Sequence, residues 1–310
     1  MKRFFNVLFL IYLIGLVLLN SCNTTVFSSA AAAPTNAPSG SSMTPTKQPS
    51  PVSTITPTKT PTSTQTVTPT STEIPVCTST VGSVEDRSIQ TELLPKPMKY
   101  KVYLPRCYSF DTKTRYPVLY LLHGQGFSED QWIRLGMVNS ADRLISTPDG
   151  VPLIIVFPFD YSSKQPKEYK FEEVFIQQLL PAVDKEYRTL ADGQHRAIGG
   201  LSRGGAWALH LGAKYPDLFS AIGGHSPAIF YNDEISLRKN LLAIPQSAMP
   251  RIWLDVGDND SELVLISAFE QFLNANNFSY EWHVFKGWHD EKYWSAHVDE
   301  YLSWYMQAWK

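Results

Sequence analysis

The sequence lacks an excess of charge of either sign. Its 27 lysine and arginine residues nearly balance its 29 aspartate and glutamate residues, the formal net charge is −2 at pH 7, and no basic run or internal repeat is present. Proteins that attract nucleic acid carry a basic patch or stripe. The composition therefore gives no indication of a nucleic-acid partner, and charge alone assigns no function.

A hydrophobic run long enough to cross a membrane is also missing. The apolar stretch from Phe4 to Leu19 has sixteen residues, fewer than the roughly 20 that a spanning helix needs. It follows the basic start Met1-Lys2-Arg3, and it ends in Leu19-Asn20-Ser21-Cys22, which resembles a bacterial lipobox. The pattern predicts an export signal over residues 1–22 with lipidation at Cys22, which would be the chain's contact with the membrane. The alternative is an ordinary signal-peptidase site at Ala30 to Ala33, so the protein is expected either at the bacterial cell surface or secreted.

Apolar periodicity is absent from the next segment, residues 23–76. More than half of its residues are Ser, Thr or Pro, with a loose repeat such as Thr56-Pro57-Thr58 and Thr68-Pro69-Thr70. Such a segment cannot bury enough apolar surface to offset the entropy of ordering. We expect a disordered stalk without recognition of its own.

Cysteine is scarce, with three residues in the chain: Cys22, Cys77 and Cys107. If Cys22 is lipidated, one pair is left, and export places that pair in an oxidising compartment. The sequence therefore predicts a disulfide between Cys77 and Cys107, with two buried free thiols as the alternative.

Residues 77–310 have the size and pattern of a single α/β domain with a mostly parallel central sheet flanked by helices. Strand-like and helix-like segments alternate along it, and Pro181 is expected to kink a helix or to start a new turn. The expected strands are 98–104, 118–122, 153–157, 195–200, 219–224, 251–256 and 280–285, and the expected helices are 129–145, 171–187, 204–214, 261–276 and 291–308. Ligands of such sheets bind beyond the carboxyl ends of the strands.

Ser202 is the strongest candidate for a reactive residue. It lies in Gly200-Leu201-Ser202-Arg203-Gly204, between an expected strand and an expected helix. This is the G-x-S-x-G pattern of a nucleophile elbow, in which a strained turn exposes the serine hydroxyl. Glycines two residues before and after the serine let neighbouring backbone pass closely.

A serine hydroxyl needs a base and an acid to become a nucleophile, and in hydrolases with this elbow both follow the serine in the chain. His289 is the predicted base because it follows the last expected strand. Asp260 is the predicted acid because it lies in the loop after strand 251–256, and Asp258 is the alternative, with loop stabilisation as the role of whichever is not catalytic. His225 ends the strand after the nucleophile helix and is expected to line or support the pocket.

Two backbone N–H groups are expected to stabilise an oxyanion. One belongs to Arg203, directly after the nucleophile and at the amino end of a helix. The other belongs to Gln125, in the turn His123-Gly124-Gln125-Gly126 after strand 118–122. That turn is also compatible with a simple tight exit from the strand.

These motifs, in this order, make residues 85–310 resemble an esterase family of the α/β-hydrolase superfamily. The family includes feruloyl and other carbohydrate esterases, S-formylglutathione hydrolases, enterochelin esterases and antigen 85 mycolyltransferases. The resemblance rests on Leu121-Leu122-His123-Gly124, on the elbow, on Gly257-Asp258-Asn259-Asp260 and on Gly287-Trp288-His289-Asp290. It implies the same Ser202, Asp260 and His289 and an α/β-hydrolase fold. No metal or cofactor is expected.

Arg203 departs from the family pattern, in which methionine is frequent at that position. Its long cation either favours a polar or anionic substrate or turns away into a salt bridge. Trp132, Tyr161 and Trp288 are candidates for an aromatic substrate-binding surface, although aromatic residues near loops often complete a core instead.

The leading hypothesis is an exported serine esterase that hydrolyses carboxylic esters through an acyl-enzyme. A carbohydrate-linked feruloyl or acetyl ester, as a small molecule or within a polysaccharide, is the expected substrate. The alternatives are acyl transfer of the mycolyltransferase type, and an esterase acting on a siderophore or a small thioester. A silent binding module is disfavoured, because Ser202, Asp260 and His289 are all present.

Overall fold

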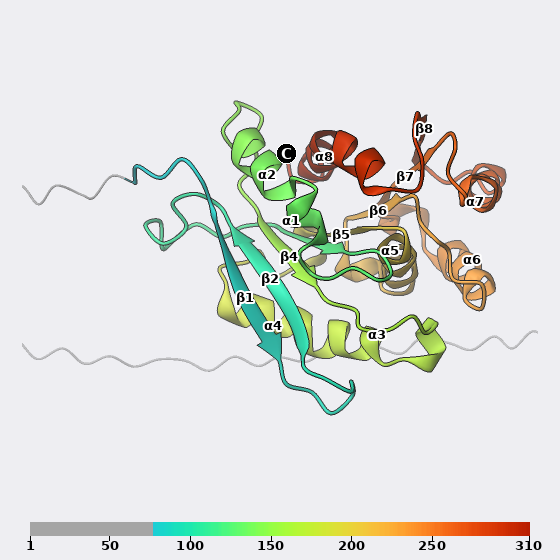
Figure 1. The fold of residues 1–310 in the computed structure, drawn as a ribbon, viewed down its shortest axis with the longest axis horizontal. Helices are drawn as coiled ribbons and strands as arrows, with labels where there is room; N and C mark the ends of the chain where they lie inside the picture. The colour runs from blue at the N-terminus through green and yellow to red at the C-terminus, as the bar shows by residue number, and fades with distance from the viewer. Residues whose placement is uncertain (1–76) are drawn as a thin grey trace, which may run out of the picture. The chain divides into compact units, whose positions relative to one another are not determined.

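The computed structural model describes residues 77–310 and contains one eight-stranded sheet (Figure 1). The strands are β1 (Ser83–Ile89), β2 (Met98–Leu104), β3 (Val118–Leu122), β4 (Ile154–Pro158), β5 (Arg196–Leu201), β6 (Ala221–His225), β7 (Arg251–Gly257) and β8 (Glu281–Phe285). Their order is β1-β2-β4-β3-β5-β6-β7-β8, and β2 runs against all the others. The predicted α/β class with a mostly parallel sheet is confirmed.

Helices cover both faces of this sheet, which explains the continuous apolar runs of its central strands. They are α1 (Gln131–Arg134), α2 (Met137–Ile145), α3 (Phe171–Val174), α4 (Leu180–Glu186), α5 (Arg203–Lys214), α6 (Glu234–Ala243), α7 (Leu263–Ala275) and α8 (Glu291–Gln307). Figure 1 shows α3 and α4 below the sheet, and α1, α2 and α8 above it. Among residues 77–310, no helix has the length and apolar character needed to cross a bilayer.

The core is divided into two layers by the sheet. On β3, Val118, Tyr120 and Leu122 belong to one buried cluster, whereas Leu119 and Leu121 belong to the other. This alternation follows from the two-residue period of a strand. The first cluster takes side chains from α3 to α7, and the second takes them from α1, α2 and α8.

Several elements differ from the sequence-based expectation. β1 was not expected; it is a polar edge strand that pairs only with β2. α6 lies between the expected strands 219–224 and 251–256, where no helix was expected, and it buries only Leu237 and Leu241. The single helix expected over 129–145 is divided at Gly136, whose φ of 100° interrupts helical geometry. Around Pro181, which cannot donate a helical hydrogen bond, the helix expected over 171–187 widens into a π-helical turn at Phe175–Leu179 before α4 begins.

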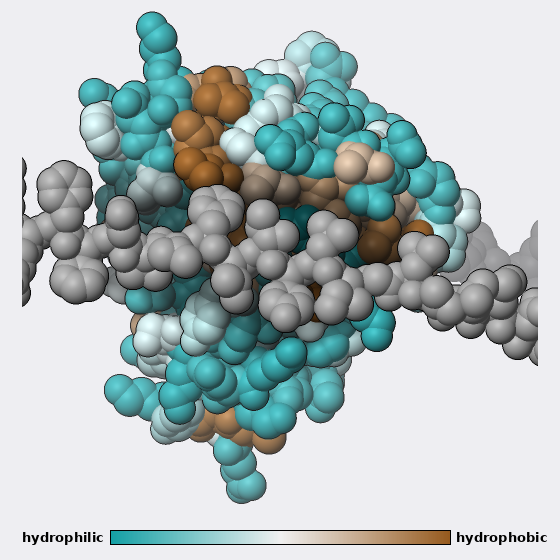
Figure 2. All heavy atoms as spheres, turned by 90° about the vertical axis from the view of Figure 1, so that its right-hand side faces the viewer, coloured by the Kyte–Doolittle hydropathy of each residue, from teal (hydrophilic) through white to brown (hydrophobic). Residues whose placement is uncertain are grey.

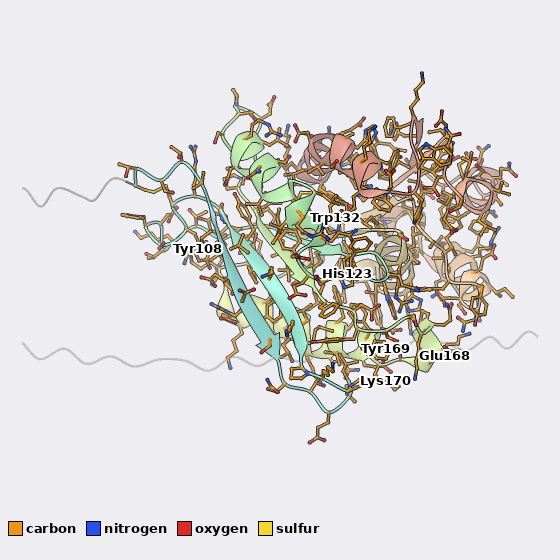
Figure 3. The ribbon with its side chains drawn as sticks, viewed as in Figure 1. Tyr108, His123, Trp132, Glu168, Tyr169 and Lys170 are labelled. Atoms are coloured by element: carbon orange, nitrogen blue, oxygen red, sulfur yellow. A yellow bond between two sulfur atoms is a disulfide. The ribbon has the colours of Figure 1, made fainter. Side chains whose placement is uncertain are left out.

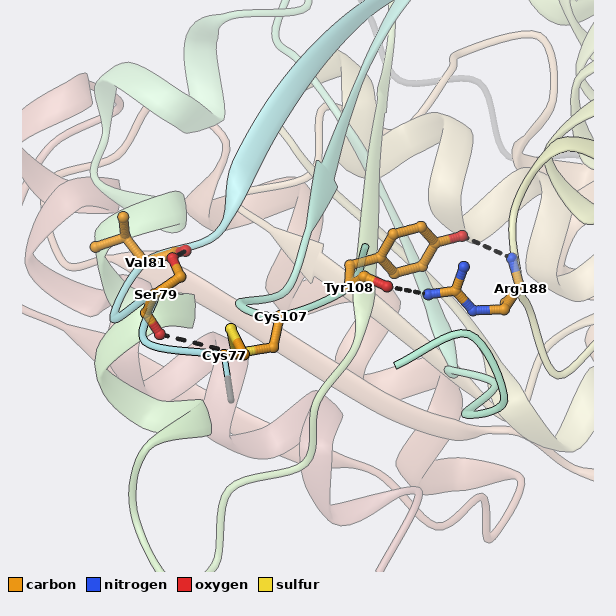
Figure 4. The surroundings of a disulfide bond; sticks show 6 residues. All are labelled: Cys77, Ser79, Val81, Cys107, Tyr108 and Arg188. Carbon is orange, nitrogen blue, oxygen red and sulfur yellow. Dashed lines mark hydrogen bonds between the residues drawn. A yellow bond between two sulfur atoms is a disulfide. The ribbon is translucent and has the colours of Figure 1, made fainter. Parts of the chain in front are cut away.

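A disulfide between Cys77 and Cys107 ties the first described residue to the loop after β2 (Figure 4). Beside it, the Arg188 guanidinium lies over the Tyr108 ring, 3.7 Å from its centroid, and the Arg188 backbone N–H donates to the Tyr108 hydroxyl. The loop follows the end of β2 that pairs with the start of β4. The disulfide therefore lies at the sheet edge where the parallel strands begin. The predicted signal segment, its Cys22, and the predicted stalk lie outside the described residues.

A buried ionic cluster links α5 to α3 and to the residue before α6. His210 on α5 contacts Asp233 through Nδ1 at 2.6 Å and Glu172 through Nε2 at 2.8 Å, and Lys214 and Tyr215 also bind Glu172. Burial opposes charge on His210, but its two carboxylate hydrogen bonds raise the pKa of its imidazole above 6.5. Burial also opposes charge on Glu172, yet hydrogen bonds from His210, Lys214 and Tyr215 lower its pKa to about 2.

The cluster predicts a pH-dependent contribution to stability. Because folding raises the pKa of His210, this residue stabilises the fold below about pH 6.5, and the stabilisation is lost as the pH rises through the pKa of the folded state. Because folding lowers the pKa of Glu172, that residue stabilises the fold above about pH 4.5, and its stabilisation is lost as the pH falls toward 2. His210→Gln should therefore cost about 1–3 kcal/mol of unfolding free energy near pH 5.5, and less near pH 8.5. Denaturant unfolding at both pH values measures this. His195→Gln, at an exposed histidine that binds Asp192, should show no comparable difference, and an equal loss for His210→Gln at both pH values would contradict the prediction.

Candidate active site

Ser202 occupies a sharp turn between β5 and α5. Its φ of 51° and ψ of −120° are unusual for a residue with a side chain. A Cβ on Gly200 would lie 2.3 Å from the Gly204 carbonyl carbon, and one on Gly204 would lie 2.2 Å from the Leu122 oxygen. Only glycine fits at these two positions, because any side chain would collide with the backbone of the turn. The close backbone packing therefore explains the two glycines of the sequence pattern.

Three side chains from separate loops form a continuous hydrogen-bonded series. The Ser202 Oγ lies 2.8 Å from His289 Nε2, and His289 Nδ1 lies 2.9 Å from each carboxylate oxygen of Asp260. The Asp260 side chain is fully buried, whereas a quarter of the His289 side chain is exposed. The series therefore runs from a buried carboxylate to a hydroxyl at the protein surface.

The environment of Asp260 favours its ionised form. Burial opposes the charge, but hydrogen bonds from His289 and from the Glu262 backbone N–H lower the pKa of this carboxyl below its ordinary value. An ionised Asp260 accepts the Nδ1 proton of His289 and so leaves Nε2 free to accept from Ser202. This is the tautomer that a general base facing a serine requires.

Asp258, the alternative acid, makes different contacts. One of its carboxylate oxygens accepts from the Asn259 side chain at 2.7 Å and from the Gly287 backbone N–H at 3.0 Å. These bonds join the loop after β7 to the loop that carries His289. The structure thus places Asp260, and not Asp258, next to the imidazole.

The turn after β3 lies against the elbow. A Cβ on Gly124 would be 3.6 Å from the Ser202 Cβ, so the Gly124–Gln125 peptide is close to the serine. No hydrogen bond joins the Gln125 backbone N–H to a described residue. Arg203 is the first residue of α5, where backbone N–H groups have no partner within the helix. Both candidate oxyanion donors therefore lie beside Ser202 and are available.

The Arg203 side chain points away from the serine. Its Nε donates to Asp160 at 2.8 Å, its Nη2 donates to the Lys164 carbonyl at 2.7 Å, and the side chain is only 4% exposed. Of the two possibilities raised by the sequence, the structure has the salt bridge. The cation is not available to a substrate.

The three candidate aromatic residues have different environments. The prediction that Trp132, labelled in Figure 3, belongs to a binding surface is wrong. Its side chain is 1% exposed, and its indole N–H donates to the Leu122 carbonyl. Tyr161 is partly buried and donates its hydroxyl proton to the Pro97 carbonyl at 2.9 Å. Trp288 is 64% exposed, directly before His289. Trp288 alone has the exposure of a recognition residue.

His225 is buried behind the site and does not line it. It contacts Asp255 through Nδ1 at 2.7 Å and the Tyr305 hydroxyl through Nε2 at 3.0 Å, and it stacks on Tyr301. Its backbone carbonyl accepts from the Ser202 N–H at 2.9 Å. The role that the structure gives His225 is therefore support of the elbow.

Exposed hydrophobic side chains lie on loops and helix starts that follow the sheet's carboxyl ends. The face on the right of Figure 1, seen directly in Figure 2, carries hydrophobic residues among hydrophilic ones. The exposed large side chains of these elements are Phe127, Tyr231, Ile235, Val264, Leu265 and Trp288. An apolar ester group would find partners on this side of the molecule.

The sequence and the fold together place the described residues in an esterase family with the α/β-hydrolase fold. The chain belongs to the family described as "Putative esterase", whose model matches residues 91–305. It is 31% identical over 235 residues to an endo-1,4-beta-xylanase/feruloyl esterase of Xylanibacter ruminicola, an alignment that covers 72% of this chain and 30% of that protein. It is 35% identical over 141 residues to Esterase Rv1288 of Mycobacterium tuberculosis, covering 43% of this chain and 30% of the relative. The chain thus spans about a third of the length of these curated relatives.

Solved structures agree on the fold. A ferulic acid esterase superposes with a TM-score of 0.67 at 26% identity, covering 74% of this chain and 98% of that one. The ferulic acid esterase AmCE1/Fae1A of Anaeromyces mucronatus, in complex with ferulic acid, superposes with a TM-score of 0.60 at 21% identity, covering 74% and 93%. The relatives described as esterases and the solved neighbours with the same fold agree with the family assignment.

Proposed function

We propose that this protein is a serine esterase that cleaves carboxylic esters through an acyl-enzyme. The observation that carries the proposal is the hydrogen-bonded series Ser202–His289–Asp260, on a strained elbow beside two available backbone N–H groups. In acylation, His289 Nε2 takes the Ser202 proton while Oγ attacks the ester carbonyl carbon. The carbonyl oxygen becomes an oxyanion that the N–H groups of Gln125 and Arg203 stabilise.

Collapse of this intermediate breaks the bond between the carbonyl carbon and the alcohol oxygen. The imidazolium of His289 gives its proton to the leaving alcohol, and the acyl group stays on Ser202. Water then attacks the acyl carbon as His289 takes its proton. The bond between that carbon and Ser202 Oγ breaks, His289 returns the proton to Oγ, and the carboxylic acid leaves. Asp260 keeps its charge throughout and stabilises the imidazolium.

The proposed substrate is a carbohydrate-linked feruloyl or acetyl ester. Feruloyl esterases are among the relatives and the solved neighbours, and exposed Trp288 and Phe127 offer apolar surface for an aromatic acyl group. A panel of methyl ferulate, acetylated xylan and short acyl esters identifies the acyl group. Product analysis with a polyol present separates hydrolysis from acyl transfer, because only transfer yields a new ester.

We further propose that the enzyme works outside the cytoplasm, on the strength of the predicted signal segment and the Cys77–Cys107 disulfide. The disulfide lies at the sheet edge where parallel strands begin, and Ser202 lies at the edge where they end.

Covalent labelling tests the nucleophile directly. A fluorophosphonate probe should modify the native protein once, and peptide mass spectrometry should find the phosphonyl group on Ser202. Ser202→Ala should prevent labelling, whereas Ser295→Ala, at an exposed serine on α8, should leave it unchanged. Native protein that stays unlabelled, or a label on another serine, would overturn the proposed mechanism.

A further inference from the structure

A buried hydrogen-bonded path joins the two proposed oxyanion donors. Asp160, in the loop after β4, accepts from Arg203 Nε at 2.8 Å through its carboxylate and donates its backbone N–H to His123 Nε2 at 2.9 Å. His123 Nδ1 in turn lies 2.7 Å from the Gly124 carbonyl oxygen. The path therefore runs from the residue after the nucleophile to the turn that carries Gln125.

The partners of His123 fix its tautomer. Because a backbone N–H can only donate, Nε2 must accept from Asp160, and Nδ1 must then carry the proton that is donated to the Gly124 carbonyl. His123 is 5% exposed, and burial lowers its pKa. The neutral ring is thus held in one orientation with a defined donor and a defined acceptor.

The bond to the Gly124 carbonyl sets the direction of the neighbouring N–H. In a planar trans peptide, the C=O of one residue and the N–H of the next point in opposite directions. His123 holds the Gly124 oxygen on its own side, so the Gln125 N–H must point to the other side. The Gly124 N–H is also held, by Gln131 Oε1 at 2.8 Å.

The same geometry applies at the elbow. The Ser202 carbonyl accepts from the N–H groups of Ala206 and Ala228, each at 3.0 Å, so the Arg203 N–H points away from them. The Arg203 side chain is then anchored on Asp160. Each donor is aimed by bonds to the carbonyl of its own peptide. On the Gln125 side, the shorter of these bonds comes from His123 Nδ1 at 2.7 Å and the longer from the Phe127 N–H at 3.3 Å.

We propose that His123 is a positioning residue that aims the Gln125 N–H at the oxyanion, and that Asp160 holds His123 in register with Arg203. His123 does not contact the reacting atoms. This inference rests on the proposed function, since it assigns a role within the same site. It gives the first residue of the His123-Gly124-Gln125-Gly126 turn a function beyond a tight strand exit.

Two amide substitutions separate the two bonds of the imidazole. Asn places an amide nitrogen where His has Nδ1 and can still donate to the Gly124 carbonyl. Gln reaches the position of Nε2 and can accept from Asp160, but it lacks the Nδ1 donor. Loss of an aligned oxyanion donor costs about 10²–10³ in rate, and misalignment should cost part of that.

The experiment measures kcat/KM for 4-nitrophenyl acetate, the inhibition constant of an aryl trifluoromethyl ketone, and thermal unfolding for H123N and H123Q. We expect His123→Gln to lower kcat/KM about 10–100-fold and to weaken the ketone, whose adduct carries an oxyanion, by the same factor. His123→Asn should stay within about 5-fold of the native enzyme in both readouts, even if its melting temperature falls as much as that of His123→Gln.

A second arm tests the link to Asp160. Asp160→Asn should weaken catalysis in the native background and have little further effect on His123→Gln, because both changes act through one path. Equal activity of the two His123 variants, or losses that follow melting temperature alone, would overturn the inference. Full hydrolysis by Ser202→Ala would instead overturn the proposed function itself.

Discussion

Replacing Ser202 by alanine is expected to lower kcat for ester hydrolysis by about 10⁴–10⁶-fold while the fold is retained. The Ser202 Oγ is the atom that His289 contacts, at 2.8 Å, and alanine leaves no nucleophile there. Residual turnover should come from water and the two oxyanion donors, as in serine hydrolases whose triad has been removed. Initial rates on 4-nitrophenyl acetate and methyl ferulate measure the loss.

The size of the loss separates nucleophilic catalysis from simple binding. Ser295→Ala serves as the matched control, because it removes a hydroxyl from an exposed site on α8 and should keep full activity. A Ser202→Ala enzyme within 10-fold of the native rate would show that another group attacks the ester. Circular dichroism of both variants shows whether an observed loss reflects unfolding.

The reactive residues proposed here were predictable because each lies in a local pattern whose place in the fold is fixed. Ser202 follows β5, and His289 follows β8. Parallel strands bring their carboxyl ends to one edge of the sheet, so residues far apart in the chain meet there. Asp260 was chosen because it lies a few residues past the end of strand 251–256, in the loop over the sheet edge, and Asp258 stayed the alternative.

The supporting residues had no comparable signal in the sequence. Asp160 meets His123 across 37 positions, and Gln131 meets Glu291 across 160. Such contacts depend on how loops pack and on which side chain fills each gap, which no periodicity encodes. Arg203 illustrates the same limit. Its guanidinium is buried and not exposed to solvent because it pairs with Asp160, since a buried cation needs a paired charge.

Aromatic residues were the least predictable group. Trp132 and Trp288 both lie in or beside loops near the site, yet one is 1% exposed and the other 64%. Trp132 is buried because its indole N–H finds the Leu122 carbonyl as a partner and its ring packs edge-on against Tyr301. Trp288 has neither contact, so its surface remains open to a ligand.

Asp260→Asn is the second substitution expected to have a large effect, of about 10⁴-fold on kcat with little change in KM. The asparagine amide can donate to His289 Nδ1, which favours the tautomer with its proton on Nε2. That proton faces Ser202, so the imidazole can no longer act as a base. The lowered pKa of Asp260 means that the native residue is charged at neutral pH, and the variant also loses stabilisation of the imidazolium.

Asp258→Asn provides the matched comparison, with the same chemical change two positions earlier. An amide oxygen can still accept from the Gly287 N–H, the bond that now joins the two loops at 3.0 Å, so kcat should stay within about 3-fold of the native value. Steady-state kinetics on one aryl ester, with melting temperatures of both variants, decides the case. If Asp258→Asn lowers kcat more than Asp260→Asn does at equal stability, the acid has been assigned to the wrong aspartate. If Asp260→Asn lowers kcat more, its carboxylate sets the tautomer of His289, as its two 2.9 Å contacts imply.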